Sequence, residues 1–184
     1  MRSGEESRRR PVGGATDDTR PDLHFVRDPL STHAREIYAM FEDPEFHFAV
    51  SHPELLSEEE IRELVDADTY GVLRGSEPIG LYSNALWGSA KEGNHDLTIR
   101  LRSDVPLETC VAVHHEVIRR IRLVHDVVRI TLWVGGYDHR GLEIARACDG
   151  LMEEGSIANE VLHHGNLYEE FAFSLVLTPP EETA

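Results

Sequence analysis

The sequence has very few cysteines, no long hydrophobic run and a shortage of basic residues. Only Cys110 and Cys148 occur among its 184 residues, and they do not form the CxxC pair that is typical of metal and redox sites. No hydrophobic run is long enough for a signal peptide or a membrane-spanning helix. These absences argue against a disulfide-stabilised secreted protein and against a membrane protein, so we expect a reducing, cytoplasmic location.

The charge of the chain is strongly one-sided. It carries 34 acidic and 18 basic residues, which gives a formal net charge of -16 at pH 7. Such a protein repels phosphate backbones and anionic membrane surfaces. We therefore expect neither nucleic acid nor a membrane as a partner. The same field favours a cationic ligand, whereas an anionic ligand would need a local group of hydrogen-bond donors.

The length and composition predict one domain with one core, because 184 residues with 40% hydrophobic content are too few for two full domains. Residues 1–20 have almost no apolar side chains and predict a disordered arm. Arg8, Arg9 and Arg10 in this arm would suit an acidic partner or simply be solvated. The predicted domain covers residues 21–178, and residues 179–184 predict a flexible tail.

Between these ends the period of the apolar residues alternates between that of strands and that of helices. Ser57 with Glu60 forms a capping-box pattern that predicts the start of a helix. Strands are predicted at 23–26, on both sides of the turn at 75–78, at 97–101, at 129–134 and on both sides of the turn at 164–166, and helices near 34–41, 57–65, 106–125 and 140–148. A strand, helix, strand order in the middle requires a parallel pair, while the hairpins are antiparallel.

This order of elements resembles that of the GNAT superfamily of acyl-CoA N-acyltransferases over roughly residues 22–177. The segment YGVLRGSEPIGLY resembles the second and third strands of the family, and CDGLMEEGSIANEVLHHGNLYEEFAFSLVL resembles its C-terminal end. The resemblance implies an α/β (α+β) fold, with a mixed, mostly antiparallel sheet of about seven strands and about four helices. It also implies acetyl-CoA or another acyl thioester as the cofactor and an amine as the acceptor.

The family holds the CoA pyrophosphate on a glycine-rich loop between the fourth strand and the long helix, because a backbone without Cβ atoms can approach phosphate closely. Here the corresponding segment, 101–110, reads LRSDVPLETC and contains no glycine. Asp104 and Glu108 place carboxylates there, and like charges at short range oppose phosphate binding. Arg100 and Arg102 are the nearby compensating charges.

The resemblance assigns cofactor and substrate positions along the middle of the chain. Splayed fourth and fifth strands would hold the pantetheine arm, and the uncapped helix start would hold an anion. The cofactor-binding residues implied in this way are Ile99, Arg100, Leu101, Arg102, Thr109 and Trp133. Tyr82, Asn84 and Trp87 would line the substrate side of the cleft, or else reflect the ordinary alternation of a half-exposed strand.

The catalytic assignments are less direct. Many members of the family use a tyrosine as the general acid in the helix after the fifth strand, but the matching residue here is Arg146. Tyr137 at the strand end is the nearest substitute, or else a helix-entry residue. His95 and Asp96 are candidates for the general base or its water chain, or else a polar pair at a strand entry. Adjacent strand residues face opposite ways, so one of the two would serve.

The remaining histidines and cysteines give no metal-ligand spacing, so no metal is expected. His114 lies on the apolar stripe of the long helix, where a buried histidine that donates to a backbone carbonyl is the favoured interpretation. His163 and His164 predict a solvated turn. Cys110 at the helix start predicts a buried small side chain, with a nucleophile as the alternative.

Three functional hypotheses follow from the sequence. The first is an N-acyltransferase that transfers an acetyl or other acyl group from a CoA or pantetheine thioester directly to an amine of a small molecule or protein. The second is a binding or regulatory module that has lost CoA. The third is another reaction on the same scaffold in a biosynthetic pathway. A homodimer is also an open expectation, formed through the strand RITLWV or the last strands if one of them lies at a sheet edge.

Overall fold

The computed structural model describes residues 21–48, 56–89 and 92–177, so the arm and tail predicted for residues 1–20 and 179–184 lie outside the described residues. The elements are, in chain order, β1 (Leu23–Arg27), α1 (Leu30–Met40), α2 (Glu58–Leu64), β2 (Thr69–Arg74), β3 (Glu77–Trp87), β4 (Asn94–Leu101), α3 (Leu107–Val124), β5 (Arg129–Gly135), α4 (His139–Ala147), β6 (Met152–His163) and β7 (Asn166–Val176).

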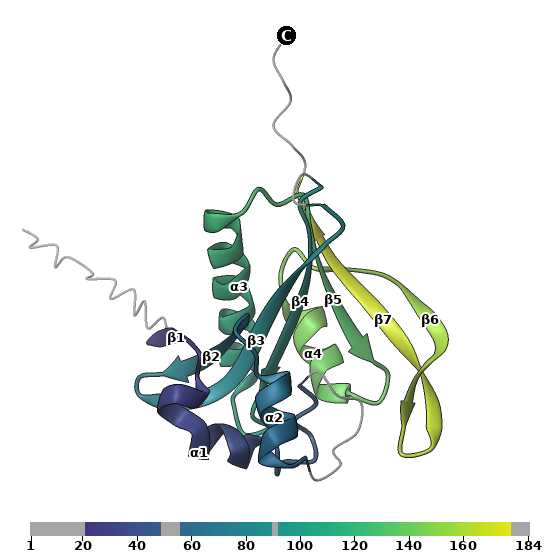
Figure 1. Cartoon of the computed structure of the whole chain (residues 1–184). Coiled ribbons are helices and arrows are strands. Elements are labelled where there is room, and N and C mark those ends of the chain that lie inside the picture. The colour runs from purple at the N-terminus through teal and green to yellow at the C-terminus, as the bar shows by residue number, and fades with distance from the viewer. Residues whose placement is uncertain (1–20, 49–55, 90–91, 178–184) are drawn as a thin grey trace, which may run out of the picture.

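The strands form one sheet in the order β1-β2-β3-β4-β5-β7-β6 (Figure 1). Every neighbouring pair is antiparallel except β4 and β5, which α3 connects as a crossover. The predicted mixed, mostly antiparallel sheet of seven strands with four helices is therefore confirmed.

The helices cover both faces of the sheet, with α1 and α2 on one face and α3 and α4 on the other (Figure 1). The larger core lies under α3, where Val113 and Val117 are fully buried against strand residues such as Ile130. A smaller core under α1 and α2 contains Ile37 and Phe48. No helix in the described ranges is long and apolar enough to cross a membrane.

Two tight turns fix the hairpins that flank the crossover. Gly75 has φ 61° between β2 and β3, where the absence of a Cβ removes the steric penalty of a left-handed conformation. At the β6–β7 turn, His164 and Gly165 both have positive φ, 47° and 76°. Positive φ at both central residues is the requirement of a two-residue hairpin turn whose twist matches that of the strands. This turn sets His163 opposite Asn166 in the register.

One of the two strands suggested for a dimer does not lie at an edge of the sheet. The strand RITLWV is β5, which pairs on one side with β4 and on the other with β7, so it offers no edge for a second copy. The last strands include β6, which is the outer strand and is exposed along nearly its whole length. A dimer that pairs at an edge would therefore use β6 or β1.

The start of α2 provides a direct test of the local structure. The Ser57 hydroxyl accepts a hydrogen bond from the Glu60 amide, and the Glu60 carboxylate accepts one from the Ser57 amide. We expect Ser57→Ala to lower the free energy of unfolding by about 1 kcal/mol and Ser57→Gly by only a few tenths. Thermal unfolding should show a fall in Tm of about 2–4 °C for the alanine variant. Equal effects of both substitutions would contradict a capping role.

Candidate functional site

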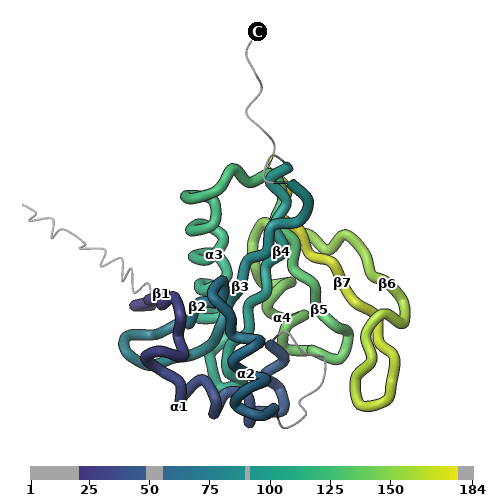
Figure 2. Tube along the Cα trace, in the orientation of Figure 1, coloured from purple at the N-terminus to yellow at the C-terminus, as the bar shows by residue number. Residues whose placement is uncertain are grey.

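The pairing of β4 with β5 stops halfway along both strands. The parallel register ends with Asp96 opposite Thr131, while β4 continues to Leu101 and β5 to Gly135. Figure 2 shows the two strands close together at one end and separated at the other. Beyond Asp96, the backbone N–H and C=O groups of β4 that face β5 have no ladder partner there. The splay therefore offers backbone polar groups to a ligand.

A small cavity of about 30 Å³ lies between the diverging ends. Its wall is formed by side chains from both strands and from the helices behind them: Ile99 and Leu101 on β4, Leu132 and Val134 on β5, His114 on α3, and Arg140 and Ile144 on α4. Glu45, from the loop after α1, also lines it. This volume holds one or two water molecules. The space is thus largely filled by side chains in this conformation.

A buried ion pair spans the splay. Arg100 near the end of β4 lies 3.5 Å from Asp138, and these side chains are only 18% and 7% exposed. Asp138 is also the N-cap of α4, since its carboxylate accepts a hydrogen bond of 2.7 Å from the Gly141 amide. The Arg100 guanidinium donates a second bond of 2.8 Å to the Ile99 carbonyl. The end of β4 and the start of α4 are held together by these contacts.

An aromatic cluster forms over this ion pair from three distant segments. Tyr137 after β5 and His163 at the end of β6 stack with ring centres 4.0 Å apart and an angle of 9°. The ring of His47, from the loop after α1, meets Tyr137 edge-on at 5.0 Å and His163 at 5.3 Å. Tyr168 on β7 lies 5.8 Å from Tyr137.

Burial sets the protonation of this cluster. It lowers the pKa of His47 below its ordinary value of 6.5, an effect that nearby Arg100 and His163 reinforce and Asp138 opposes. His47 is therefore neutral at pH 7. Burial likewise raises the pKa of Tyr137, which keeps its hydroxyl protonated. On β7, burial raises the pKa of Glu170, and the carboxylate of Glu160 adds to this rise.

Two buried side-chain nitrogens within the described ranges have no hydrogen-bond partner, and both belong to this site. They are Nδ1 of His47 and Nε of Arg100. An unsatisfied buried polar atom costs about 1–3 kcal/mol, so native structures usually supply a partner from the protein, water or a ligand. Their occurrence together, at the end of the splay, indicates a place for an external polar group.

No protein-family model matches the chain, and no curated protein sequence matches it. Its structure, however, is similar to those of several acetyltransferases. One is the acetyltransferase from Salmonella typhimurium that modifies the N-terminal serine of ribosomal protein L7/L12, with TM-score 0.70, 13% identity, and 85% of this chain and 96% of that chain covered. Another is spermidine N-acetyltransferase from Vibrio cholerae, solved with CoA and spermine, with TM-score 0.66, 14% identity, and 84% and 95% covered. A third is the GNAT-family acetyltransferase from Bacillus anthracis, with TM-score 0.62, 11% identity, and 84% and 95% covered.

The chain has the GNAT fold. This confirms the fold that the sequence predicted from its resemblance to the superfamily. At identities of 11–14% the similarity is one of fold, and a fold alone does not determine an activity.

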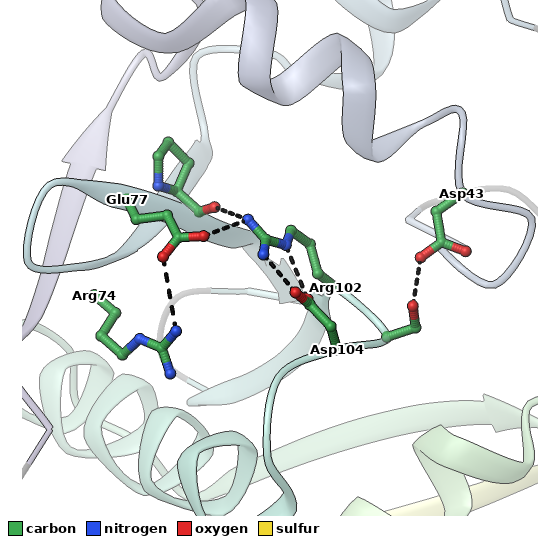
Figure 3. Close-up of polar contacts among 7 residues, drawn as sticks. Asp43, Arg74, Glu77, Arg102 and Asp104 are labelled. Atoms are coloured by element: carbon green, nitrogen blue, oxygen red, sulfur yellow. Dashed lines mark hydrogen bonds and ion pairs between the residues drawn. The ribbon is translucent and has the colours of Figure 1, made fainter.

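The loop that leads from β4 into α3 is the place where the GNAT resemblance implies the CoA pyrophosphate, and its charges are already paired (Figure 3). Arg102 donates two hydrogen bonds to Asp104, of 2.9 and 2.6 Å, and one of 2.7 Å to Glu77. Ser103 donates to Asp43 at the end of α1, at 2.8 Å. These contacts hold the pKa of Asp104 below its ordinary value, so its negative charge persists at neutral pH.

The gap between α3 and α4 is also closed next to this loop. The Arg140 guanidinium on α4 donates a hydrogen bond of 2.7 Å to the Val105 carbonyl just before α3, and a second bond of 3.1 Å to Glu143 of its own helix holds it in place. The N-cap of α3 is Pro106, which has no amide hydrogen. With no glycine in the loop and a carboxylate beside it, these residues do not fit a CoA pyrophosphate.

The residues predicted for catalysis and substrate binding lie in two separate places. Tyr137 is at the splay, in the aromatic cluster. His95 is buried at the other end of β4, where its Nδ1 lies 3.2 Å from the Asn84 Oδ1 atom. Tyr82 is also buried and stacks on Tyr70, and Trp87 is 68% exposed. Asp96 is half-buried, at the last paired position before the splay.

The residues predicted to bind the cofactor are likewise divided. Ile99, Arg100 and Leu101 line the splay cavity. Thr109 is buried in the first turn of α3, and Trp133 on β5 is 40% exposed. Arg102 is held by Asp104 and Glu77 as described above. These assignments stay predictions.

His47, His163 and Glu170 are site residues that sequence reasoning missed. The turn prediction for His163 is correct, but His163 stacks on Tyr137 and is not simply solvated. His47 lies between Phe46 and Phe48, which are both buried, and a histidine flanked by apolar residues in a loop is a signal of burial that could have been used. Among the described residues, no group of three or more His, Cys, Asp or Glu side chains could hold a metal ion.

His114 gives a pH test of the packing behind the cavity. It is buried and its Nδ1 donates to the Cys110 carbonyl at 2.8 Å, as predicted for a core histidine. Burial lowers its pKa from 6.5 to about 4. Between pH 6.5 and about 4 the unfolded chain therefore binds more protons at His114 than the folded chain. The free energy of unfolding is highest above pH 6.5, and it falls as the pH drops toward 4.

We expect the free energy of unfolding to fall by about 3 kcal/mol across this window because of His114 alone. Urea unfolding at a series of pH values should show a flatter dependence for His114→Gln, whatever its absolute stability. The exposed neighbour His115 is the control, and His115→Gln should keep the slope of the unchanged protein. An identical slope in all three proteins would show that His114 is not a buried neutral group.

Proposed function

We propose that the splay and the aromatic cluster form the active site of an N-acyltransferase, which acylates the amine of a small molecule or a protein, with the donor in the splay and the acceptor at the aromatic cluster. The observation that carries this proposal is the pair of unsatisfied buried nitrogens, His47 Nδ1 and Arg100 Nε, at the end of the splay. Similarity to N-acetyltransferases of the same fold supports it.

His47 has the properties that the deprotonation of an amine requires. An amine must lose a proton when it attacks a thioester carbonyl, and the accepting group must be unprotonated at the working pH. Its lowered pKa leaves His47 neutral, and its Nδ1 has no competing partner. The carboxylates of Asp138 and Asp43 favour the imidazolium that forms, because both raise the pKa of His47.

Tyr137 is positioned to return a proton. Its raised pKa keeps the hydroxyl protonated, and its ring contacts both His47 and His163. A protonated hydroxyl beside the reacting centre would serve the departing thiolate. Tyr137 would in this way act as the general acid, because Arg146 stands at the helix position where many members of the family have a tyrosine for this role.

The charges around the site favour a cationic acceptor. Glu45 lines the cavity, Glu170 interacts with Arg100, and Asp138 already neutralises that arginine. The chain as a whole carries a charge of -16, which raises the local concentration of cations. Polyamines and protein N-termini, the acceptors named for two of the similar structures, are cationic amines.

The donor is an acyl thioester whose pantetheine arm enters the splay, where it would displace the side chains that reduce the cavity to about 30 Å³. Pantetheine contains two amides, which suit the unpaired backbone groups of β4 in the manner of an added strand. We place the recognition of the donor in this arm because the loop before α3 does not fit a pyrophosphate. Such thioesters occur inside cells, which agrees with the cytoplasmic location expected from the sequence.

A second candidate function is ligand binding without transfer. The closed loop around Arg102 and Asp104 and the small splay cavity favour it, because a cofactor would have to displace side chains to enter. A binding module and an enzyme differ in one observable, which is release of free thiol from an acyl thioester in the presence of an amine.

Thiol release tests the proposal when S-acetyl-pantetheine and acetyl-CoA are each combined with polyamines and with peptides that have a free N-terminus. We expect turnover with at least one pair, and we expect His47→Gln to lower kcat/KM by about 10²–10⁴-fold, the usual contribution of a general base. Tyr137→Phe should lower kcat and leave acceptor binding intact.

His139→Gln is the matched control, because His139 is an exposed histidine at the start of α4, next in sequence to Asp138. It should retain full activity. Turnover that His47→Gln leaves unchanged would remove His47 from the mechanism, and an absence of turnover with every pair would leave the binding module.

A further inference from the structure

A second, larger cleft lies at the opposite end of α3 from the splay. It has a volume of about 770 Å³ and lies between the C-terminal half of α3 and strands β2 and β3. Figure 1 shows this end of α3 at the same end of the molecule as the far ends of β3 and β4. Small-molecule sites commonly have volumes of about 300–1,000 Å³. The cleft is therefore of ligand size, and the acyl-transfer proposal does not use it.

The floor of this cleft is aromatic. Tyr70 on β2 and Tyr82 on β3 are cross-strand partners, and their rings stack with centres 4.9 Å apart at an angle of 11°. Phe25 on β1 meets Tyr82 edge-on at 5.6 Å. Tyr70 remains half-buried at the cleft wall, so a flat ligand has an aromatic edge and face to pack on.

A cation that is not committed to a carboxylate stands beside this floor. The Arg120 guanidinium lies over the Phe25 ring, 4.8 Å from its centre, and reaches the Tyr82 hydroxyl. Within the part of the chain that the structure describes, its contacts are with these two rings, and no ion pair with a carboxylate is found for it. Its neighbour Arg119, by contrast, makes two bonds of 2.7 Å to Glu116. Of the two described arginines that line the cleft, Arg119 and Arg120, Arg119 is held by a carboxylate and Arg120 is not.

The rest of the lining is consistent with an amphipathic ligand. Leu86, Leu123 and Val124 form an apolar margin, and the last two are 69% and 73% exposed. Asn84 also lines the cleft, and its amide oxygen lies 3.2 Å from His95 Nδ1. Asp68 is the single carboxylate among the lining residues and would repel a second negative charge.

We propose that this cleft binds a small aromatic carboxylate, with its ring against the half-buried Tyr70, which the buried Tyr82 supports from behind, and its single carboxylate on Arg120. A guanidinium pairs with a carboxylate through two parallel hydrogen bonds, which gives both charge and directional specificity. The apolar margin covers the outer side of the ring. One negative charge is the favoured number, because Asp68 opposes a dianion.

Phenylacetate, its neutral analogue phenylacetamide and the cationic analogue phenethylamine are the probes for this site. Titration of the full chain, followed by chemical shifts of the ¹⁵N-labelled backbone, should give a dissociation constant of about 1 mM or lower for phenylacetate, which is reasonable for so few heavy atoms. The shifts should be confined to residues of β2, β3 and the C-terminal half of α3. Phenylacetamide and phenethylamine should bind at least about tenfold more weakly.

Arg120→Gln should raise the dissociation constant of phenylacetate by about tenfold or more, since it removes the charge and keeps hydrogen-bonding capacity. Arg122→Gln is the matched control, because Arg122 is an exposed arginine of the same helix that does not line the cleft. Equal binding of the acid and the amide, an unchanged affinity in Arg120→Gln, or no shifts at about ten times the expected dissociation constant would each overturn the proposal. These outcomes do not depend on whether the splay catalyses acyl transfer.

Discussion

The loss of pairing between β4 and β5 beyond Asp96 and Thr131 is the constraint on which the site depends. A continuous parallel pair would satisfy the backbone of both strands and leave no room between α3 and α4. The splay exposes backbone polar groups and brings the ends of β4 and β5 to opposite sides of a small cavity. Arg100 and Asp138 connect these two sides through their ion pair, which also caps α4.

The same opening explains why the unsatisfied atoms gather there. The ion pair is buried, so each of its groups needs further partners, and Arg100 finds one for its terminal nitrogen but none for Nε. The His47 ring contacts Tyr137 and His163 edge-on, and its Nδ1 atom is buried. A polar ligand that reached either nitrogen would satisfy it, which would couple binding to the stability of the site.

Two features of the loop before α3 oppose the binding of a pyrophosphate, and they differ in weight. The ion pairs of Arg102 with Asp104 and Glu77 are partly exposed, and such pairs contribute at most about 1 kcal/mol each, so a ligand could displace them. The lack of glycine is the stronger obstacle. The Cβ atoms of the loop residues occupy the space that close approach to a phosphate requires, and a ligand cannot displace them. For this second reason we place donor recognition in the pantetheine arm.

Much of the fold could be predicted from the sequence because its signals are local. The Ser57 and Glu60 cap, the turn at Gly75 and the apolar stripe of α3 each lie within a few neighbouring residues, and all of them were found in the structure. The site is different in kind. His47 and His163 are 116 positions apart and meet only because the β6–β7 hairpin returns over the end of β5.

The partners of Arg102 show the same limit of sequence reasoning. Its charge near the loop was evident, but Glu77 is 25 residues away and becomes its partner only through the pairing of β3 with β4. A charged residue can be assigned to a ligand from sequence only when its neighbours in space are known.

The central claim is that the donor is recognised through its pantetheine arm, without a pyrophosphate cradle, and calorimetric titration of CoA beside pantetheine tests it most directly. The account predicts that both bind with dissociation constants that agree within about threefold, since the nucleotide adds no stabilising contact. Binding of CoA more than about tenfold tighter than pantetheine would contradict it, because at least about 1.4 kcal/mol would then come from the nucleotide portion.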